Sequence, residues 1–298
     1  PYPVAISCHA TPGGGMEYPM ISCNGGRPEP DGTYSEQVKY GMIGVIIHEV
    51  GHNFFPMIVN SDERQWAWMD EGLNTFCQYL AEKEWDYNWP TRRGEPQSIV
   101  DYMSSDKSVL SPIMASAENV IGLGPNAYAK PAAALNILRE TVMGRELFDY
   151  AFKEYANRWR FKSPEPADFF RTMEDASGVD LDWFWKGWFF GTEPVDQDLV
   201  SVEWFSIDTQ NPEVEKELAR QEAARKAKTM SKLRDAETKD QTVVGQDSTM
   251  ADFYNSYDPF KVTDSDRRRY DEYLASLSPE ERDLVQSNTN FYTLNVKN

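Results

Sequence analysis

Two of the three histidines in this chain lie four residues apart, with a glutamate directly after the first, in His48-Glu49-Val50-Gly51-His52. On a helix, residues i and i+4 share one face, so both imidazoles can reach a single metal ion. Glu49 lies roughly 100° around the helix axis from His48, beside that ion rather than on it. A general base for an attacking water belongs in that position. The pattern therefore predicts a metal centre that activates water, rather than a chance pair of surface histidines.

Two histidines leave such a centre incomplete, because a catalytic zinc site uses three protein ligands and keeps one position for water. Two adjacent carboxylates, Asp70 and Glu71, follow the second histidine, and Glu71 comes after eighteen intervening residues. Either carboxylate could face the first helix across a short connection. The spacing alone does not choose between them.

The helices that must position these side chains can be read from caps and apolar spacing. Ser35 is a candidate N-cap for a helix through residue 50, and a second helix is predicted from about residue 70 to before Pro90. A third is predicted at 132–142 with Pro131 in its first turn, followed by three more between 145 and 190. Upstream, two short strands are predicted at 4–10 and 20–23 around a glycine-rich turn at 13–15.

These motifs resemble those of the gluzincin metallopeptidases, in particular the aminopeptidase N family that includes leukotriene hydrolase. In that family the pattern is H-E-x-x-H-x18-E, with the last glutamate inside W-L-N-E-G, and this chain has Trp68-Met69-Asp70-Glu71-Gly72. The resemblance implies that Glu71 is the third ligand and that the cofactor is one Zn²⁺ ion. It also implies a thermolysin-like α+β catalytic region, mostly helical in this piece, over residues 1–195.

The segment Gly14-Gly15-Met16-Glu17-Tyr18 is similar to the G-x-M-E-N motif of the same family, with Tyr18 in place of the asparagine. In the family, the glycines form a strand edge that pairs with the substrate backbone, and the glutamate binds the free α-amino group. The resemblance therefore implies that Gly14, Gly15 and Met16 contact a peptide and that Glu17 binds its amine.

Downstream, Tyr128-Ala129-Lys130-Pro131 resembles the family motif Y-x-K-G, with proline in place of the glycine. The tyrosine of that motif donates a hydrogen bond to the oxyanion that forms during attack, so the resemblance assigns this role to Tyr128.

The resemblance thus implies a zinc metallopeptidase, most consistent with an aminopeptidase acting on peptides with a free N-terminus. An endopeptidase with the same zinc chemistry is an alternative, although Glu17 argues against it because an internal peptide has no amine to offer. Two further alternatives are a non-catalytic peptide-binding module and a chain that is inactive without neighbouring domains.

The composition argues against several classes of binding partner. Acidic residues outnumber basic ones by 48 to 30, which gives a formal net charge of −18 and argues against nucleic acid and anionic lipid as partners. We find no run of about eighteen apolar residues, so no membrane span is expected. The three cysteines make no disulfide framework, although Cys8 and Cys23 could pair if neighbouring strands carry them. The compartment is left open.

Residues 196–298 are predicted to form a charged helical extension that leads into a further β domain. The expected elements are a strand at 199–207, a helix at 213–240, a polar linker at 242–250, a helix at 264–287 and an interrupted strand at 290–298. Because the chain opens at Pro1 and ends in this strand, we expect it to be a piece that packs against N- and C-terminal domains of its own protein.

Overall fold

The computed structural model describes residues 4–11, 14–26, 33–194, 204–206, 208–252, 257–287 and 290–292. The chain divides into two compact units, which we call the first and the second unit. The first is made of Pro1–Pro194 and Lys228–Asn255, and the second of Val195–Ala227 and Ser256–Asn298. The assignment of residues 1–195 and 196–298 to separate domains stays a prediction.

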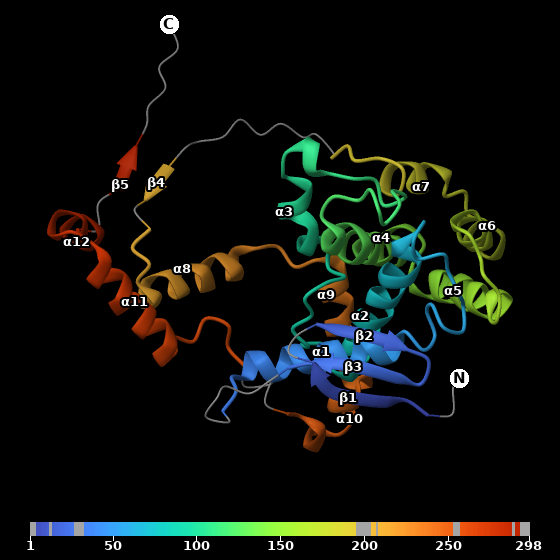
Figure 1. The fold of residues 1–298 in the computed structure, drawn as a ribbon, viewed down its shortest axis with the longest axis horizontal. Helices are drawn as coiled ribbons and strands as arrows, with labels where there is room; N and C mark the ends of the chain where they lie inside the picture. The colour runs from blue at the N-terminus through green and yellow to red at the C-terminus, as the bar shows by residue number, and fades with distance from the viewer. Residues whose placement is uncertain are drawn as a thin grey trace, which may run out of the picture. The chain divides into compact units, whose positions relative to one another are not determined.

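A three-stranded sheet opens the first unit (Figure 1). Strand β1 (Ile6–Thr11) runs parallel to β3 (Ile21–Gly25), and β2 (Gly15–Tyr18) runs antiparallel to β3. The order is β1-β3-β2, so β2 lies at one edge of this sheet. The prediction of two strands around a glycine turn was wrong. The chain turns at Gly14, which takes a φ of 70°, and Gly15 already begins the third strand.

The two N-terminal cysteines lie side by side in this sheet. Cys8 of β1 and Cys23 of β3 are partners in the strand register, as a disulfide would need, and both are free thiols. The question that the sequence left open is therefore answered in favour of two thiols in this structure.

Helix α1 (Glu36–Gly51) begins as predicted after Ser35, whose hydroxyl accepts a hydrogen bond from the Val38 backbone N–H at 3.2 Å. It packs against β2 and β3 of the sheet and against α2 (Leu73–Trp85) (Figure 1). The metal motif lies at the C-terminal end of α1, so this packing holds it between the sheet and α2.

Two segments of the first unit contain π-helical turns. The turn η1 (Trp68–Gly72) leads directly into α2, and η4 (Gly124–Ala129) leads into α4 (Lys130–Ile137) and then η5 (Leu138–Val142). The third helix therefore starts at Gly124 rather than at residue 132, and the predicted start was wrong. Pro131 sits in the first turn of α4, but the π-helical turn already precedes it.

Three helices follow between residues 145 and 190, as predicted: α5 (Arg145–Trp159), α6 (Pro166–Ser177) and α7 (Asp182–Trp188). Gly178 takes the left-handed conformation, with a φ of 69°, that ends α6. The large side chains that these helices bury with η1, α2 and the residue after α7 are Trp68, Phe76, Phe148, Tyr155, Phe169, Phe184 and Phe189. Turn η1 packs against this aromatic core and contributes Trp68 to it.

The remaining elements of the first unit are short, and several come from beyond residue 227. They are η2 (Pro96–Ile99), α3 (Val100–Met103), η3 (Lys107–Val109), α9 (Met230–Glu237), η6 (Lys239–Gln241), α10 (Val243–Gln246) and η7 (Ser248–Met250). Helix α9 is joined to the rest of the first unit through the buried Glu140 carboxylate, which pairs with Arg234 at 3.2 Å and with Arg145 at 2.8 Å.

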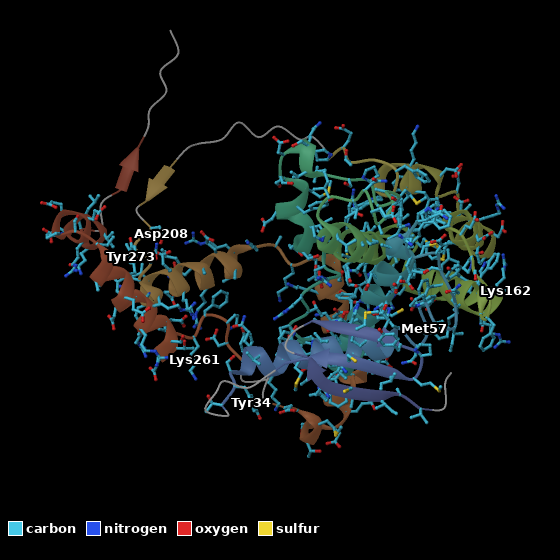
Figure 2. The ribbon with its side chains drawn as sticks, in the orientation of Figure 1. Tyr34, Met57, Lys162, Asp208, Lys261 and Tyr273 are labelled. Carbon is cyan, nitrogen blue, oxygen red and sulfur yellow. The ribbon has the colours of Figure 1, made fainter. Side chains whose placement is uncertain are left out.

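The described part of the second unit contains β4 (Trp204–Ser206), α8 (Pro212–Arg225), α11 (Asp264–Ser276), α12 (Pro279–Gln286) and β5 (Asn290–Tyr292). Strands β4 and β5 pair antiparallel. Lys216 of α8 bonds to the Lys261 backbone oxygen at 2.8 Å, just before α11; Figure 2 labels Lys261.

Three predictions for residues 196–298 were wrong in detail. The helix predicted at 213–240 is two helices, α8 and α9, and the helix predicted at 264–287 is also two, α11 and α12. The linker predicted at 242–250 contains the short helices α10 and η7. The rest of the two predicted strands, at 199–203, 207 and 293–298, lies outside the described residues. Among the described residues, no helix combines the length and the apolar character that a bilayer crossing requires.

Candidate metal centre and cleft

The three side chains predicted as ligands come together between α1 and η1. The Nε2 atom of His48 lies 3.0 Å from Oε2 of Glu71, the Nε2 atom of His52 lies 3.3 Å from the same oxygen, and the two Nε2 atoms are 3.1 Å apart. Donor atoms at the corners of a tetrahedral zinc site, with bonds of 2.0–2.1 Å, lie about 3.3 Å from one another. The donor set and its spacing therefore fit a zinc ion, and this buried group can hold a metal.

The outer nitrogens of both histidines face oxygen atoms. The Nδ1 atom of His48 lies 3.0 Å from Oε1 of Gln78, and that of His52 lies 2.8 Å from the Phe55 backbone oxygen and 2.9 Å from Oδ1 of Asp70. Because an oxygen without a hydrogen can only accept, each Nδ1 donates, which leaves the lone pair of Nε2 directed at the centre. Asp70, the other carboxylate that the sequence spacing allowed as third ligand, thus contacts the outer nitrogen of His52.

The charges around this group favour a cation. Although burial opposes it, hydrogen bonds from His48 and His52 lower the pKa of the Glu71 carboxyl to about 2. Burial also works against a protonated His52, but Asp70 and Glu71 outweigh it and raise the pKa of His52 to about 11. The same carboxylates that would hold a proton here would hold a metal ion in its place.

Glu49 lies beside the three donors, on the neighbouring face of α1. It is 6% exposed, and burial together with repulsion from Glu17 and Glu71 raises the pKa of its carboxyl to about 7. Among the described residues its Oε2 atom has no hydrogen-bond partner. A buried carboxyl with a pKa near neutrality and a free oxygen has the properties of a general base.

The edge strand β2 presses against this carboxyl. A Cβ atom added at Gly15 would overlap the carboxyl group of Glu49, so only glycine permits this approach. A carboxylate oxygen of Glu17, two residues on, lies within 4.8 Å of the nearest ligand atoms of His52 and Glu71. Strand β2 therefore brings a glycine edge and a second carboxylate to the side of the centre nearer His52.

The other residues of this glycine motif divide between two faces of β2. Gly14, Gly15 and Glu17 line the cleft described below. Met16 and Tyr18 alternate with them, as side chains along a strand do, and are 44% and 53% exposed. Met16 is not among the cleft-lining residues, and its contact with a peptide stays a prediction.

Tyr128 reaches the centre from the π-helical turn η4. Its ring stacks near that of His48, with centroids 5.7 Å apart and planes at 23°, and the Arg93 guanidinium lies 4.6 Å from its centroid. Burial, with the nearby charge of Glu71, raises the pKa of the Tyr128 hydroxyl, so it stays protonated and able to donate. Turn η4 and the start of α4 pack against η1 at Gly72, where an added Cβ would come 3.0 Å from the Ala127 backbone oxygen and 2.6 Å from Cγ of Pro131.

One cleft of about 520 Å³ is lined by seven of the predicted residues, namely Gly14, Gly15, Glu17, His48, Glu49, Glu71 and Tyr128. Beyond the predicted residues, its walls are formed by Tyr40, Gly41, Gly44, Val45, Thr75, Gln78, Tyr79, Glu82, Arg92, Arg93, Leu123 and Gly124. Three of these residues bear on chemistry and were not predicted from the sequence, namely Gln78, Arg92 and Arg93. Gln78 lies seven residues after Glu71, on the same face of a helix, and that spacing was the available signal.

Comparison with known proteins supports the family resemblance that the motifs indicate. The family model described as "Peptidase family M1 domain" matches residues 12–188. Glutamyl aminopeptidase of Sus scrofa is 26% identical over 172 residues, which cover 56% of this chain and 18% of that protein. "Probable aminopeptidase 2" of Sulfurisphaera tokodaii is 27% identical over 195 residues, which cover 63% of this chain and 24% of that protein.

The chain thus spans about a fifth of the length of these curated relatives. Among solved structures, an M1 zinc metallopeptidase from Deinococcus radiodurans is similar at 19% identity and a TM-score of 0.46, over 65% of this chain and 42% of that one. The resemblance read from the motifs is confirmed. The chain belongs to the M1 peptidase family, the zinc metallopeptidases of the aminopeptidase N and leukotriene A4 hydrolase type, and has a mostly helical α+β form of their catalytic region.

Proposed function

We propose that this chain carries the catalytic centre of a zinc-dependent aminopeptidase, which removes the N-terminal residue of a peptide. The observation that carries the proposal is the convergence of three metal-ligating atoms, 3.0–3.3 Å apart, next to the buried Glu49 carboxyl. His48, His52 and Glu71 would hold the ion. A zinc ion held there would act as a Lewis acid on the substrate carbonyl and would make water more acidic.

Glu49 takes the proton of the attacking water. Its raised pKa suits a group that must accept a proton near neutral pH and then release it. The same carboxyl passes the proton to the departing amine, so the base is regenerated when the peptide bond breaks. Gly15 keeps strand β2 close against this carboxyl and limits its motion.

Tyr128 donates a hydrogen bond to the oxygen on which negative charge develops. Its position beside His48 and the protonated state of its hydroxyl support this role. A donor of this kind contributes most when water is excluded, and a comparable donor in another hydrolase accounts for about a hundredfold or more of the rate.

Glu17 binds the substrate amine, and the edge of β2 pairs with the peptide backbone. The edge position of β2 and the carboxylate of Glu17 near His52 support both assignments. A carboxylate at this end of the cleft stabilises a bound ammonium group. An internal peptide segment would leave that carboxylate covered without a partner.

The proposal is tested with one decapeptide, incubated with the zinc-loaded chain once with a free N-terminus and once acetylated, and followed by mass spectrometry. We expect stepwise trimming of the free peptide and none of the acetylated one. Internal cleavage of both would identify an endopeptidase and contradict the role of Glu17. Absence of any cleavage would contradict activity of this chain by itself and would favour a peptide-binding module or a dependence on neighbouring domains.

A further inference from the structure

We propose that Arg92 and Arg93 form a carboxylate-binding subsite at the end of the cleft away from Glu17, and that it accepts a carboxylate on the leaving-group side of a short peptide. The inference rests on the proposed function, which supplies the direction of the peptide, and it adds a substrate class. That class is the short peptide whose free amine and free carboxylate are both bound.

The two arginines sit at different depths of the same cleft. An Nη atom of Arg92 lies against α1, 3.2 Å from where a Cβ on Gly41 would be. The Arg93 guanidinium lies over the Tyr128 ring, 4.6 Å from its centroid, and that ring in turn stacks near His48. The Tyr128 ring thus lies between Arg93 and His48, one of the three predicted metal ligands. Arg92 lies farther along α1.

Neither guanidinium forms an ion pair with any described residue, unlike the arginines around Glu140. The cleft carboxylates whose charges act on them are held by other groups. Glu71 bonds to the two histidines, and Glu82 accepts a hydrogen bond from Gln78 at 2.8 Å. In a chain with 48 acidic and 30 basic residues, two adjacent cations at a cleft that have no ion-pair partner among the described residues are available to bind an anion.

The chemistry of the pair selects the ligand. A guanidinium presents a planar fork of donors that matches a carboxylate in a bidentate geometry. Both arginine side chains are exposed to solvent and therefore open to a ligand.

The order of charges along α1 gives the length of the peptide. Glu17 lies at the His52 end, and Arg92 lies at Gly41, which precedes His48 by seven residues or about 10 Å of helix. An extended peptide advances about 3.3 Å per residue, so Arg92 reaches a carboxylate about three residues beyond the cleaved bond. Arg93 serves one that lies closer. Gly41 and Gly44 add no side chain to this wall of the cleft.

The test measures binding apart from turnover. In the zinc-loaded chain with Glu49→Gln, calorimetry compares tetra-alanine with its C-terminal amide and with an amide that carries aspartate at the third position. We expect the free acid to bind about tenfold tighter than the plain amide, as charge-assisted hydrogen bonds suggest. The combined Arg92→Gln and Arg93→Gln change should remove that difference, and Arg171→Gln, at an exposed position of α6, should keep it.

The outcomes separate the sources and the two proposals. Tight binding of the aspartate amide would show that a side-chain carboxylate serves as well as the chain terminus. Equal affinity for acid and amide, no binding of either, or a preference that survives loss of both arginines would overturn the subsite. The turnover of the decapeptide by the unchanged chain tests the proposed function separately. Failure there with a retained carboxylate preference would refute only the peptidase.

Discussion

In the first unit, aromatic rings pack edge to face around η1, whereas in the second unit the helices α8 and α11 meet through charged side chains. Trp68 lies 5.7 Å from Phe169 and 4.8 Å from Phe189, between ring centroids. Within 208–227 and 257–287, the residues of the second unit whose burial is described, Val285 is the one hydrophobic side chain that is buried. Ion pairs join α8 and α11, for example Arg267 with Glu213 at 2.8 Å, and both of these side chains are exposed.

The two units therefore obtain their stability from different kinds of contact. Burial of a large aromatic side chain contributes several kcal/mol, whereas an exposed ion pair contributes about 0–1 kcal/mol. The chemistry requires donor atoms held to within a few tenths of an ångström, and the unit with the dense core carries them. We therefore expect the second unit to open at lower denaturant concentration and to respond more strongly to salt.

The largest expected effect separates the two units by activity. Changing Glu49→Gln removes the base and should lower peptide turnover by a factor of about 10² to 10⁴, while zinc stays bound. The same change at the exposed Glu280 of α12, in the second unit, should leave turnover unchanged. Turnover is measured on a free peptide, and bound zinc by elemental mass spectrometry. Surviving turnover after Glu49→Gln would refute the mechanism.

The next effect concerns the two interiors. Changing Phe169→Ala removes a fully buried ring from the centre of the core and should cost the first unit about 3–5 kcal/mol. The matched change Leu284→Ala, at a residue that is 49% exposed, should stay within about 0.5 kcal/mol. Urea unfolding followed by tryptophan fluorescence reports on the first unit, because eight of the nine tryptophans belong to it. Equal losses of stability for the two variants would contradict the expected difference between the two interiors.

A smaller effect depends on pH in the first unit. Burial raises the pKa of the Glu82 carboxyl from 4.5 to about 7, so its contribution to stability is full below pH 4.5 and is lost as the pH rises through about 7. Glu82→Gln should then stabilise the first unit by up to about 3 kcal/mol at pH 8 and by little at pH 4. Urea midpoints at both pH values give the difference, and a gain that is equal at both would contradict the assignment.

The smallest effect has the opposite sign and lies in the second unit. Hydrogen bonds from Lys216 and from the Thr263 backbone lower the pKa of Asp266. The stability that Asp266 contributes is therefore present above about pH 4 and is lost as the pH falls through its lowered pKa. Asp266→Asn should cost about 1 kcal/mol at neutral pH, less in high salt, and nothing in strong acid. Hydrogen exchange of the α11 amides measures it, and a cost of several kcal/mol would contradict the comparison.

The convergence of His48, His52 and Glu71 could be expected from the sequence because its two main elements are local. The spacing of His48 and His52 is a property of any helix, and the motif around Glu71 is specific enough to identify the family. The outer partners were not predictable in this way. Gln78 acts through the packing of α2 on α1, which Asn74 also supports by donating to the His48 backbone oxygen at 2.7 Å. Many polar helical residues share that spacing and contact nothing.

Arg92 and Arg93 illustrate a second limit. They follow Pro90 in a segment without regular apolar spacing, so the sequence does not indicate which part of the fold this segment contacts. In the structure the segment lines the cleft, beside α1 and Tyr128. Tertiary packing alone makes these two arginines part of the site.

The helix ends of the charged extension were missed for a different reason. A polar stretch without apolar periodicity carries little information on where a helix stops. One signal was present, since Ser278-Pro279-Glu280-Glu281 has the letters of a capping box, and the Ser278 and Glu281 side chains do form one at the start of α12. Thr229 caps α9 in a similar way. Caps were therefore more informative here than overall helical composition.

The π-helical turn η1 has an evolutionary consequence. A turn of this kind holds one residue more than an α-helical turn, and here it carries Glu71 directly ahead of α2. Deletion of Gly72 would let the turn close to an ordinary α-helix and would swing Glu71 by about 100° relative to α2. The loss of a single codon would thus dismantle the ligand triangle without altering either histidine or Glu71. By this route a peptidase can evolve into a peptide-binding protein that keeps the motif residues of an enzyme but not their geometry.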